Sequence, residues 1–227
     1  MKQADPPPLG VFWECLTCGF RYVEAPFREP PRGSHCPRCG GNAHIAAKVP
    51  VPLQEHKTSP PPPPGPRLAV LLDNVRSAYN VGAAFRTADG AGVERLYLTG
   101  ITPTPPHRGI AKTALGADQR VVWHTHPNSV HLSARLQAEG WALWALETAP
   151  KAVSLPDLLQ GALPARVVVA VGNEVAGLDP ELLARADAVI ALPMWGVKRS
   201  LNVISALAVV LYGLRLFGER GVTRGGF

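Results

Sequence analysis

MWGVKRSLNVISALAVVLY, residues 194–212, joins a short polar segment to a long apolar one. Two basic residues, Lys198 and Arg199, precede a Ser-Leu-Asn step, and an apolar helical pattern follows that step. A helix needs only one capping residue at its start. The additional polar residues predict a functional role for this segment, and we expect the helix to begin near Ser200.

Short apolar runs alternate with helical patterns on the amino-terminal side of this segment. The helical patterns lie around residues 80–91, 129–140 and 180–186. The apolar runs are LAVLLD (68–73), VERLYLTG (93–100), WALWALE (141–147), RVVVAVG (166–172) and AVIALP (188–193). Buried strands that alternate with helices predict an α/β fold, in which a parallel sheet carries helices on both faces. No GxGxxG sequence follows the first run, which argues against an ordinary dinucleotide-binding domain.

Polar residues and glycines follow three of these runs, at the strand ends where α/β folds build their sites. In DNVRSAYNVGAAFRTADGAG (73–92), Asn80 is placed to cap a helix, and Arg86 projects from its first turns. In GNEVAGLDPELL (172–183), glycines frame a tight loop before a helix. The third segment follows Pro193. Each segment alone also fits an ordinary cap or a solvated helix face.

In this order and spacing, the three segments resemble the three motifs of the SpoU/TrmH-type RNA ribose 2′-O-methyltransferases, within the SPOUT superfamily. The resemblance covers about residues 67 to 217, and it departs at Ile204, where a smaller residue is expected. The matching residues are Asn80 and Arg86 in the first motif, Gly172-Asn173-Glu174 through Gly177 in the second, and Pro193-Met194 with Ser200-Leu201-Asn202-Val203 in the third.

The resemblance implies a parallel sheet whose C-terminal part is threaded into a deep trefoil knot, although general connection rules argue against knots. It also implies S-adenosylmethionine bound by the knot loops and a homodimer that completes each site. The residues expected to bind the cofactor are Gly172, Asn173, Glu174, Gly177, Ile190, Leu192, Met194, Ser200 and Leu201. The apolar members of this set also fit a plain core. The residues expected to act in catalysis are Asn80, Arg86, Glu174, Ser200 and Asn202.

The implied substrate is the ribose 2′-hydroxyl of a structured RNA, either tRNA or rRNA. This hydroxyl is a poor nucleophile at neutral pH. A group of the site must therefore accept its proton, or stabilise the charge that develops on its oxygen, as the methyl group is transferred. The resemblance assigns this role to Arg86, oriented by Asn80. We expect Ser200 to cap the last helix, Asn202 to fix its first turn, and Lys198 with Arg199 to face phosphates. The alternatives are an RNA-binding scaffold without turnover and a base methyltransferase of the same superfamily.

All four cysteines lie in the first 40 residues, as the pairs CLTC (Cys15, Cys18) and CPRC (Cys36, Cys39). Two C-x2-C pairs separated by 17 residues predict one tetrahedral Zn²⁺ site. Disulfides or a redox-active pair are the alternatives, and a reducing compartment disfavours the disulfides. The nearby His35 and His44 are expected to be ordinary loop residues, because four cysteines complete the site.

A proline-rich stretch, VPVPLQEHKTSPPPPPGPR (49–67), separates this module from the α/β region. Five consecutive prolines favour an extended polyproline II spacer, and a ligand for a proline-recognising domain is the alternative. We therefore predict a zinc-ribbon module (1–48), a proline-rich linker (49–66) and a methyltransferase domain (67–227).

The composition agrees with one sizeable core and a small appendage: the chain has 227 residues, of which 46% are hydrophobic and 18% charged. A net charge of +6 favours an anionic partner, although many enzymes with other substrates match it. The N-terminus MKQADPPPLG lacks an apolar signal region, and the apolar stretch 203–214 is too short to span a bilayer. These features predict a cytoplasmic protein without a membrane partner.

The last helix is expected to lie at the homodimer interface. Its apolar residues span more than one stripe of the helix surface, so the helix needs cover on two sides. The alternative is that the sheet of the same chain supplies both. These residues are Leu201, Val203, Ile204, Leu207, Val210, Leu211 and Leu214.

Overall fold

The computed structural model of the protein describes residues 9–24, 34–50 and 65–217. The chain divides into two compact units, residues 1–60 and 61–227. The five consecutive prolines lie outside the described residues, so the polyproline spacer stays a prediction. Among the helices of the described residues, none has the length and apolar character that a membrane span requires.

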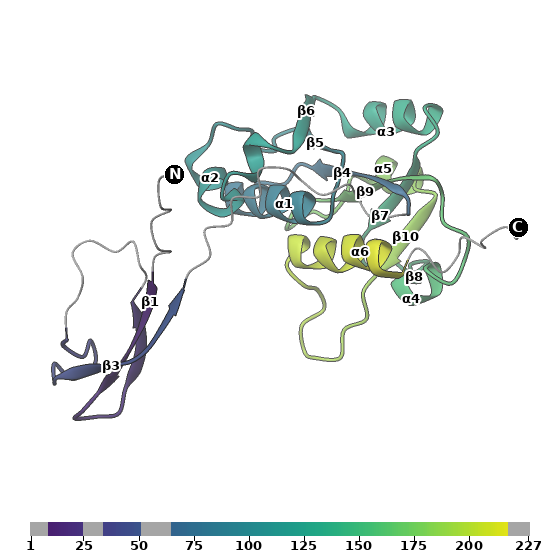
Figure 1. Ribbon diagram of the computed structural model, residues 1–227. Helices are drawn as coiled ribbons and strands as arrows, with labels where there is room; N and C mark the ends of the chain where they lie inside the picture. Colours follow the sequence, from purple (N-terminus) through teal and green to yellow (C-terminus); the bar gives the residue numbers. More distant parts are fainter. Residues whose placement is uncertain (1–8, 25–33, 51–64, 218–227) are drawn as a thin grey trace, which may run out of the picture. The chain divides into compact units, whose positions relative to one another are not determined.

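The first unit contains a three-stranded antiparallel sheet in the order β2-β1-β3 (Figure 1). Its strands are β1 (Leu9–Cys15), β2 (Arg21–Glu24) and β3 (Ala43–Pro50). The last strand runs two residues past the predicted end of the module at residue 48, because Val49 and Pro50 pair with β1. Among the described residues of this unit, the buried apolar side chains are Cys15, Cys36 and Ala43. Hydrophobic burial therefore contributes little to its stability.

Within residues 65–217, seven strands form one sheet in the order β6-β5-β4-β9-β7-β10-β8, and every adjacent pair runs parallel. The predicted parallel α/β fold is confirmed, whereas the trefoil knot stays a prediction. The strands are β4 (Arg67–Asp73), β5 (Arg95–Thr99), β6 (Val122–His126), β7 (Ala142–Leu146), β8 (Val153–Ser154), β9 (Arg166–Val171) and β10 (Ala188–Ala191).

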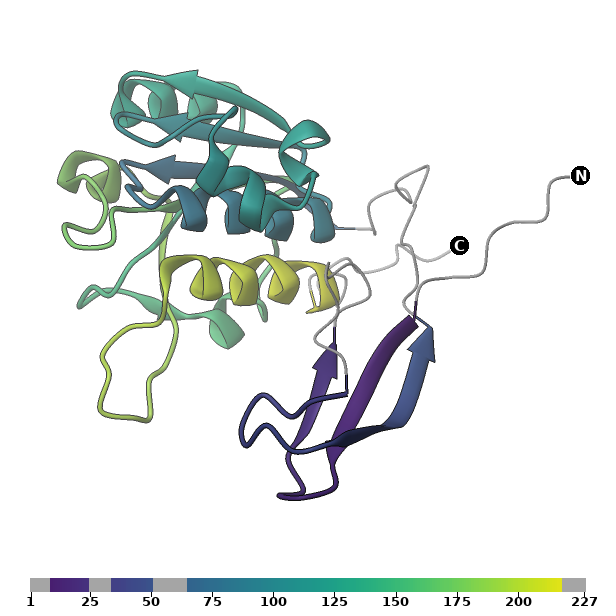
Figure 2. The ribbon, with the colours of Figure 1, turned by 90° about the vertical axis from the view of Figure 1, so that its left-hand side faces the viewer.

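Helices cover both faces of this sheet because the central strands are apolar on both sides (Figures 1 and 2). One core joins alternate strand residues to α1, α2, α4 and α6, and the other joins the remaining ones to α3 and α5. The helices are α1 (Ala78–Gly90), α2 (Arg108–Ala114), α3 (Ser129–Ala138), α4 (Leu155–Leu158), α5 (Pro180–Ala184) and α6 (Val203–Phe217), with a 3-10 turn η1 (Ala117–Gln119).

Most of the apolar residues predicted to need cover on α6 are buried within the same chain, in the core shared with the sheet and α1, and the homodimer interface stays a prediction. Ile204 is 4% exposed and joins the core, so the larger residue at this motif position is accommodated. A different stripe stays uncovered within the chain: Val209, Tyr212 and Leu216 are 48%, 42% and 68% exposed.

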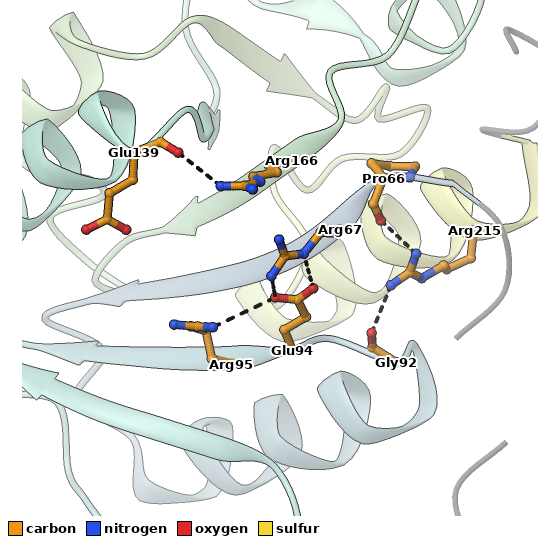
Figure 3. A network of polar contacts seen from close by, with 8 residues as sticks. All are labelled: Pro66, Arg67, Gly92, Glu94, Arg95, Glu139, Arg166 and Arg215. Carbon is orange, nitrogen blue, oxygen red and sulfur yellow. Dashed lines mark hydrogen bonds and ion pairs between the residues drawn. The ribbon is translucent and has the colours of Figure 1, made fainter. Parts of the chain in front are cut away.

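A network of arginines lies at the end of the sheet where the strands begin (Figure 3). Arg67 donates two hydrogen bonds to the carboxylate of Glu94, and Arg95 forms an ion pair of 3.9 Å with the same carboxylate. Arg215 of α6 is buried, and it donates to the carbonyl oxygens of Ala91 at 2.7 Å and of Pro66 and Gly92 at 2.8 Å. This arginine ties the end of α6 to the end of α1 and the start of β4.

Candidate active site

A pocket of about 430 Å³ lies at the opposite edge, where the strands end. Three segments line it: the end of β7, the loop after β9, and the connection from β10 into α6. All nine residues predicted to bind the cofactor line this pocket: Gly172, Asn173, Glu174, Gly177, Ile190, Leu192, Met194, Ser200 and Leu201.

The loop after β9 is held in a tight turn. The backbones of Asn173 and Gly177 exchange two hydrogen bonds of 2.9 Å. A side chain at Gly172 would overlap the backbone of Gly177 and Leu178, so only glycine permits this close approach. The side chain of Asn173 accepts two amide hydrogen bonds inside the loop and donates to the carbonyl of Asn74 at 2.7 Å. The loop therefore presents backbone polar groups to the pocket in a fixed geometry.

Glu174 connects this loop to the start of α1. One carboxylate oxygen accepts a hydrogen bond from the N–H of Arg76 at 3.0 Å. The other accepts from the N–H of Ser77 at 3.0 Å and from the side-chain amide of Asn80 at 2.9 Å. Asn80 in turn accepts from the side chain of Asn202 at 3.1 Å. A chain of hydrogen bonds, Glu174–Asn80–Asn202, thus joins all three predicted motifs.

These donors keep Glu174 ionised. Desolvation of the carboxylate alone would raise its pKa. The hydrogen bonds from the N–H of Arg76, its own N–H, the Asn80 amide and the N–H of Ser77 together outweigh desolvation and lower the pKa of Glu174. A charged Glu174 is therefore part of the site over the physiological pH range.

Two capping predictions are wrong. The N-cap of α1 is Ser77, whose hydroxyl accepts from the N–H of Asn80, so Asn80 itself lies inside the first turn. At α6, the side-chain oxygen of Asn202 accepts from the N–H groups of Ile204 at 2.9 Å and Ser205 at 3.2 Å. A capping side chain must reach the second or third helical amide, and Ser200 precedes the helix by too many residues to do so. Ser200 instead lines the pocket.

Within the described chain the Asn80 amide pairs with Glu174 and Asn202 and not with Arg86, so the orientation of Arg86 by Asn80 stays a prediction. Arg86 lies six residues further along α1, which is about 9 Å at 1.5 Å per residue. It is exposed, it does not line the pocket, and its side chain forms no hydrogen bond or ion pair within the described residues. The pocket of one chain thus contains Glu174, Ser200 and Asn202 but not Arg86.

The connection from β10 to α6 carries the predicted phosphate-facing residues. Lys198 and Arg199 are both exposed, and Arg199 lines the pocket. Two apolar residues of the same connection are almost fully exposed, Trp195 at 92% and Val197 at 100%. This connection extends away from the sheet (Figure 1).

Sequence reasoning missed Glu147, which also lines the pocket. Its carboxylate accepts hydrogen bonds from the N–H of Thr148 at 2.8 Å and of Leu178 at 3.2 Å, and it therefore braces the far side of the β9 loop. The signal was available, because Glu147 is the polar last residue of the apolar run 141–147.

The first unit contains a second candidate site, made by its four cysteines. Their sulfur atoms lie within 4.8 Å of one another, with Cys15 and Cys39 3.5 Å apart and Cys18 and Cys36 3.8 Å apart. In a tetrahedral site with Zn–S bonds of about 2.3 Å, the sulfur atoms are about 3.8 Å apart. The cluster therefore has the size of a Zn²⁺ site.

The pKa values of the thiols also indicate that a cation is needed to keep all four deprotonated. The N–H of Cys18 donates to the sulfur of Cys15 and lowers the pKa of Cys15 to about 6, although desolvation opposes this. At Cys39, the N–H of Gly41 acts in the same direction. The thiols of Cys18 and Cys15 and desolvation together outweigh it and raise the pKa of Cys39 to about 12. Four adjacent sulfurs therefore need a metal ion to hold all of them as thiolates.

Comparison with known proteins gives one family match. The profile of the SpoU rRNA Methylase family matches residues 67–212. The chain is 33% identical over 147 residues to the tRNA (guanosine(18)-2'-O)-methyltransferase of Escherichia coli K12, a match that covers 65% of this chain and 62% of that protein. It is 30% identical over 148 residues to the 23S rRNA (guanosine-2'-O-)-methyltransferase RlmB of Ralstonia nicotianae, covering 65% and 58%. The chain thus spans somewhat under two thirds of the length of these relatives.

Solved structures share the fold of the second unit. The TrmH/SpoU tRNA modifying enzyme of A. aeolicus superimposes with a TM-score of 0.60 at 28% identity, over 69% of this chain and 79% of that one. The AdoMet-bound rRNA methyltransferase of Sinorhizobium meliloti superimposes with a TM-score of 0.62 at 29% identity, over 68% and 57%.

Proposed function

Because the chain belongs to the SpoU rRNA methylase family, we propose that it is an enzyme that transfers a methyl group from S-adenosylmethionine to a ribose 2′-hydroxyl of a structured RNA. One observation carries this proposal. The hydrogen-bonded chain Glu174–Asn80–Asn202 joins the three motif segments, and the second and third of them line one pocket. Relatives named for tRNA and for rRNA match about equally well, so either RNA class is a candidate substrate.

The pocket suits S-adenosylmethionine in size and chemistry. A volume of about 430 Å³ lies within the usual range for small-molecule sites, about 300–1,000 Å³. The β9 loop offers fixed backbone donors and acceptors for the edges of an adenine ring, while Ile190 and Leu192 offer apolar surface. The cofactor supplies an electrophilic methyl group, so the chain has only to bind it, exclude water and orient the hydroxyl.

Arg86 is proposed to stabilise the charge that develops on the ribose oxygen, with a substrate phosphate bound to the same guanidinium. Since Arg86 lies outside the pocket of its own chain, we propose a homodimer in which the second copy supplies its Arg86. The uncovered stripe Val209, Tyr212 and Leu216 of α6 supports a second copy as the missing cover. Sedimentation of residues 66–227 tests the dimer, and a monomer at micromolar concentration contradicts it.

The activity can be tested in two steps. Purified protein is titrated with S-adenosylmethionine and is then incubated with total RNA and methyl-labelled cofactor. We expect binding, followed by label that resists alkaline cleavage, because 2′-O-methylation blocks hydrolysis at the modified link. Failure to bind the cofactor would favour an RNA-binding scaffold, and label found on the bases after digestion to nucleosides would identify a base methyltransferase.

We further propose that Cys15, Cys18, Cys36 and Cys39 bind one structural Zn²⁺ per chain, and that the protein is cytoplasmic, where thiols stay reduced. The small buried core of the first unit supports the metal as its main source of stability. Metal analysis after purification without chelators is expected to give one zinc per chain. Cys36→Ser should unfold the first unit and leave the second folded, and absence of zinc in the unmodified protein contradicts this assignment.

A further inference from the structure

The short helix α2 presents a basic stripe to solvent. Arg108 and Lys112 are four residues apart, so they lie on the same side of the helix, and both are exposed. Leu115, the residue that ends α2, is 67% exposed and lies next to these cations in the sequence. The opposite side of α2 is buried through Gly109, Ile110 and Ala114. The burial of α2 in the core fixes the direction in which its cations point.

Helix α1 packs closely beside α2 and continues the same surface. A side chain at Gly82 would overlap Thr113 and the backbone of Ile110, so the two helices approach directly. The hydroxyl of Thr113 donates to the carbonyl of Tyr79 at 2.9 Å. Tyr79 and Arg86 are seven residues apart, two turns along one side of α1, and both are exposed, Tyr79 at 54%. The two helices therefore form one rigid surface. This surface carries three cations and one aromatic ring.

The cations of this surface have no ionic partners within the described residues. The ion pairs of the described chain involve Arg21, Arg67, Arg95 and Arg135, all on other elements. Arg86, Arg108 and Lys112 are in none of them. Asp89 and Asp118 are the acidic residues of the same helices and turn, and they leave an excess of positive charge. A rigid surface whose three cations form no ion pairs in the described chain, with an exposed aromatic ring beside them, favours a polyanion with stackable bases over a protein partner.

We propose that this surface, the α1–α2 face (Tyr79, Arg86, Arg108, Lys112 and Leu115), binds the RNA substrate. Arg108 and Lys112 bind backbone phosphates, and Tyr79 stacks on an unpaired base. The phosphates that bind α2 run beside Arg86, so this face directs the strand to the arginine assigned to catalysis. The inference rests on the proposed function and specifies where its substrate docks.

The test compares two variants of the full-length protein that lose the same charge on opposite faces of the sheet. Arg108→Ala/Lys112→Ala changes the α1–α2 face, and Arg135→Ala/Arg185→Ala changes α3 and the end of α5. The affinity for total tRNA and rRNA is measured between 50 and 200 mM salt, together with the affinity for S-adenosylmethionine. Each phosphate contact contributes about 0.7–0.9 to the slope of log K against log salt.

We expect the α1–α2 variant to bind RNA about tenfold or more weakly, with a slope smaller by about 1.4–1.8 for two lost contacts. Its affinity for S-adenosylmethionine and its thermal unfolding should match the unmodified protein. The α3–α5 variant should keep the slope. An unchanged slope in the first variant, or an equal loss in both, overturns the inference. A switch from dimer to monomer in the first variant also overturns it, because the face is then an interface between copies.

Tyr79 supplies a second readout that charge alone does not affect. Tyr79→Phe keeps the ring and should bind RNA normally, whereas Tyr79→Ala should weaken binding by at least tenfold without changing the salt slope. Equal affinity of the two variants removes the stacking role. If the unmodified protein binds RNA through this face but transfers no methyl group, the proposed activity fails while the docking surface stands. If it methylates RNA while the Arg108/Lys112 variant binds normally, only the docking surface fails.

Discussion

Polar groups are satisfied in opposite ways at the two ends of the strands of the seven-stranded sheet, called here its two edges. Where the strands begin, the Arg215 guanidinium binds the carbonyls of Ala91 and Gly92, just past the C-terminal end of α1. Where the strands end, the Glu174 carboxylate binds the N–H groups of Arg76 and Ser77 at the start of the same helix. A helix leaves free carbonyls at one end and free N–H groups at the other. Backbone direction therefore favours a cation at the end of α1 and a carboxylate at its start, and the pocket described above lies on the side of the carboxylate.

The largest effect should come from breaking the closed edge at Arg215. Arg215→Met removes three donors from buried carbonyls, and we expect a loss of about 3 kcal/mol in the free energy of unfolding. The protein that stays folded should bind S-adenosylmethionine normally, because Arg215 is remote from the pocket lining. Denaturant unfolding and cofactor titration measure the two effects. Arg135→Met, at an exposed arginine, is the control, and equal stability of the two variants contradicts the structural role of Arg215.

Arg86 differs from Arg215 because its side chain forms no hydrogen bond or ion pair within the described residues. Its removal should therefore affect catalysis and not stability. Arg86→Ala should slow methyl transfer by about a hundredfold or more, while unfolding and cofactor binding stay unchanged. Arg86→Lys should be nearly as slow, since ammonium lacks the planar fork of guanidinium. Single-turnover transfer to RNA measures the effect. Methylation by Arg86→Ala at close to the normal rate would reduce Arg86 to a residue of the helix surface.

The sequence predicted the parts of the fold whose side chains are buried on both sides. Strands β4 and β9 read as continuous apolar runs because both faces of the sheet are covered there. Strand β6, with the sequence VWHTH, escaped prediction because it is an edge strand with exposed residues on both faces. Helix α2 escaped because its seven residues give too little periodicity to recognise.

The candidate site was predictable in its segments but not in its contacts. Strand ends and glycines located the β9 loop, since those features follow from backbone geometry. The contacts of Asn80 with Glu174 and Asn202 were not predicted, because these residues lie 94 and 122 positions away in the sequence and local spacing suggests only caps and helix faces. Glu147 was missed for the same reason: its partner Leu178 comes from another strand connection.

Asn202 caps α6 and is proposed to act in the site, so its variants separate the two roles. Asn202→Ala removes the cap of α6 and should cost about 1 kcal/mol in the free energy of unfolding. Asn202→Ser restores a capping oxygen, but its shorter side chain cannot cap α6 and also reach Asn80. It should therefore recover most of the stability, whereas both variants should bind the cofactor less tightly than the unmodified protein. Denaturant unfolding and titration with S-adenosylmethionine measure both. Full cofactor affinity in Asn202→Ser would show that the link to Asn80 is dispensable.

The smallest effect concerns one glutamate at each edge, Glu94 and Glu174, whose pKa values are both lowered but for different reasons. The hydrogen bonds from Arg67 are the main cause at Glu94, whereas backbone and amide N–H groups outweigh desolvation at Glu174. A carboxyl group with a lower pKa in the folded state stabilises the fold above its unfolded pKa, near 4.5, and this stabilisation is lost as pH falls through the folded value. Both Glu94→Gln and Glu174→Gln should therefore be less stable than the unmodified protein at pH 7, and the differences should shrink as the pH drops below 4.5.

Salt should distinguish the two edges. The interaction of Glu94 is with a full charge on an exposed guanidinium, so 1 M NaCl should remove most of the Glu94→Gln difference. The partners of Glu174 are fixed dipoles held at hydrogen-bonding distance, so the Glu174→Gln difference should persist in the same salt. Urea unfolding of the three proteins at low and high salt, at pH 7 and at pH 3, measures all of these differences. A Glu174 contribution that disappears in salt while that of Glu94 persists would reverse the assignment of charge to one edge and dipoles to the other.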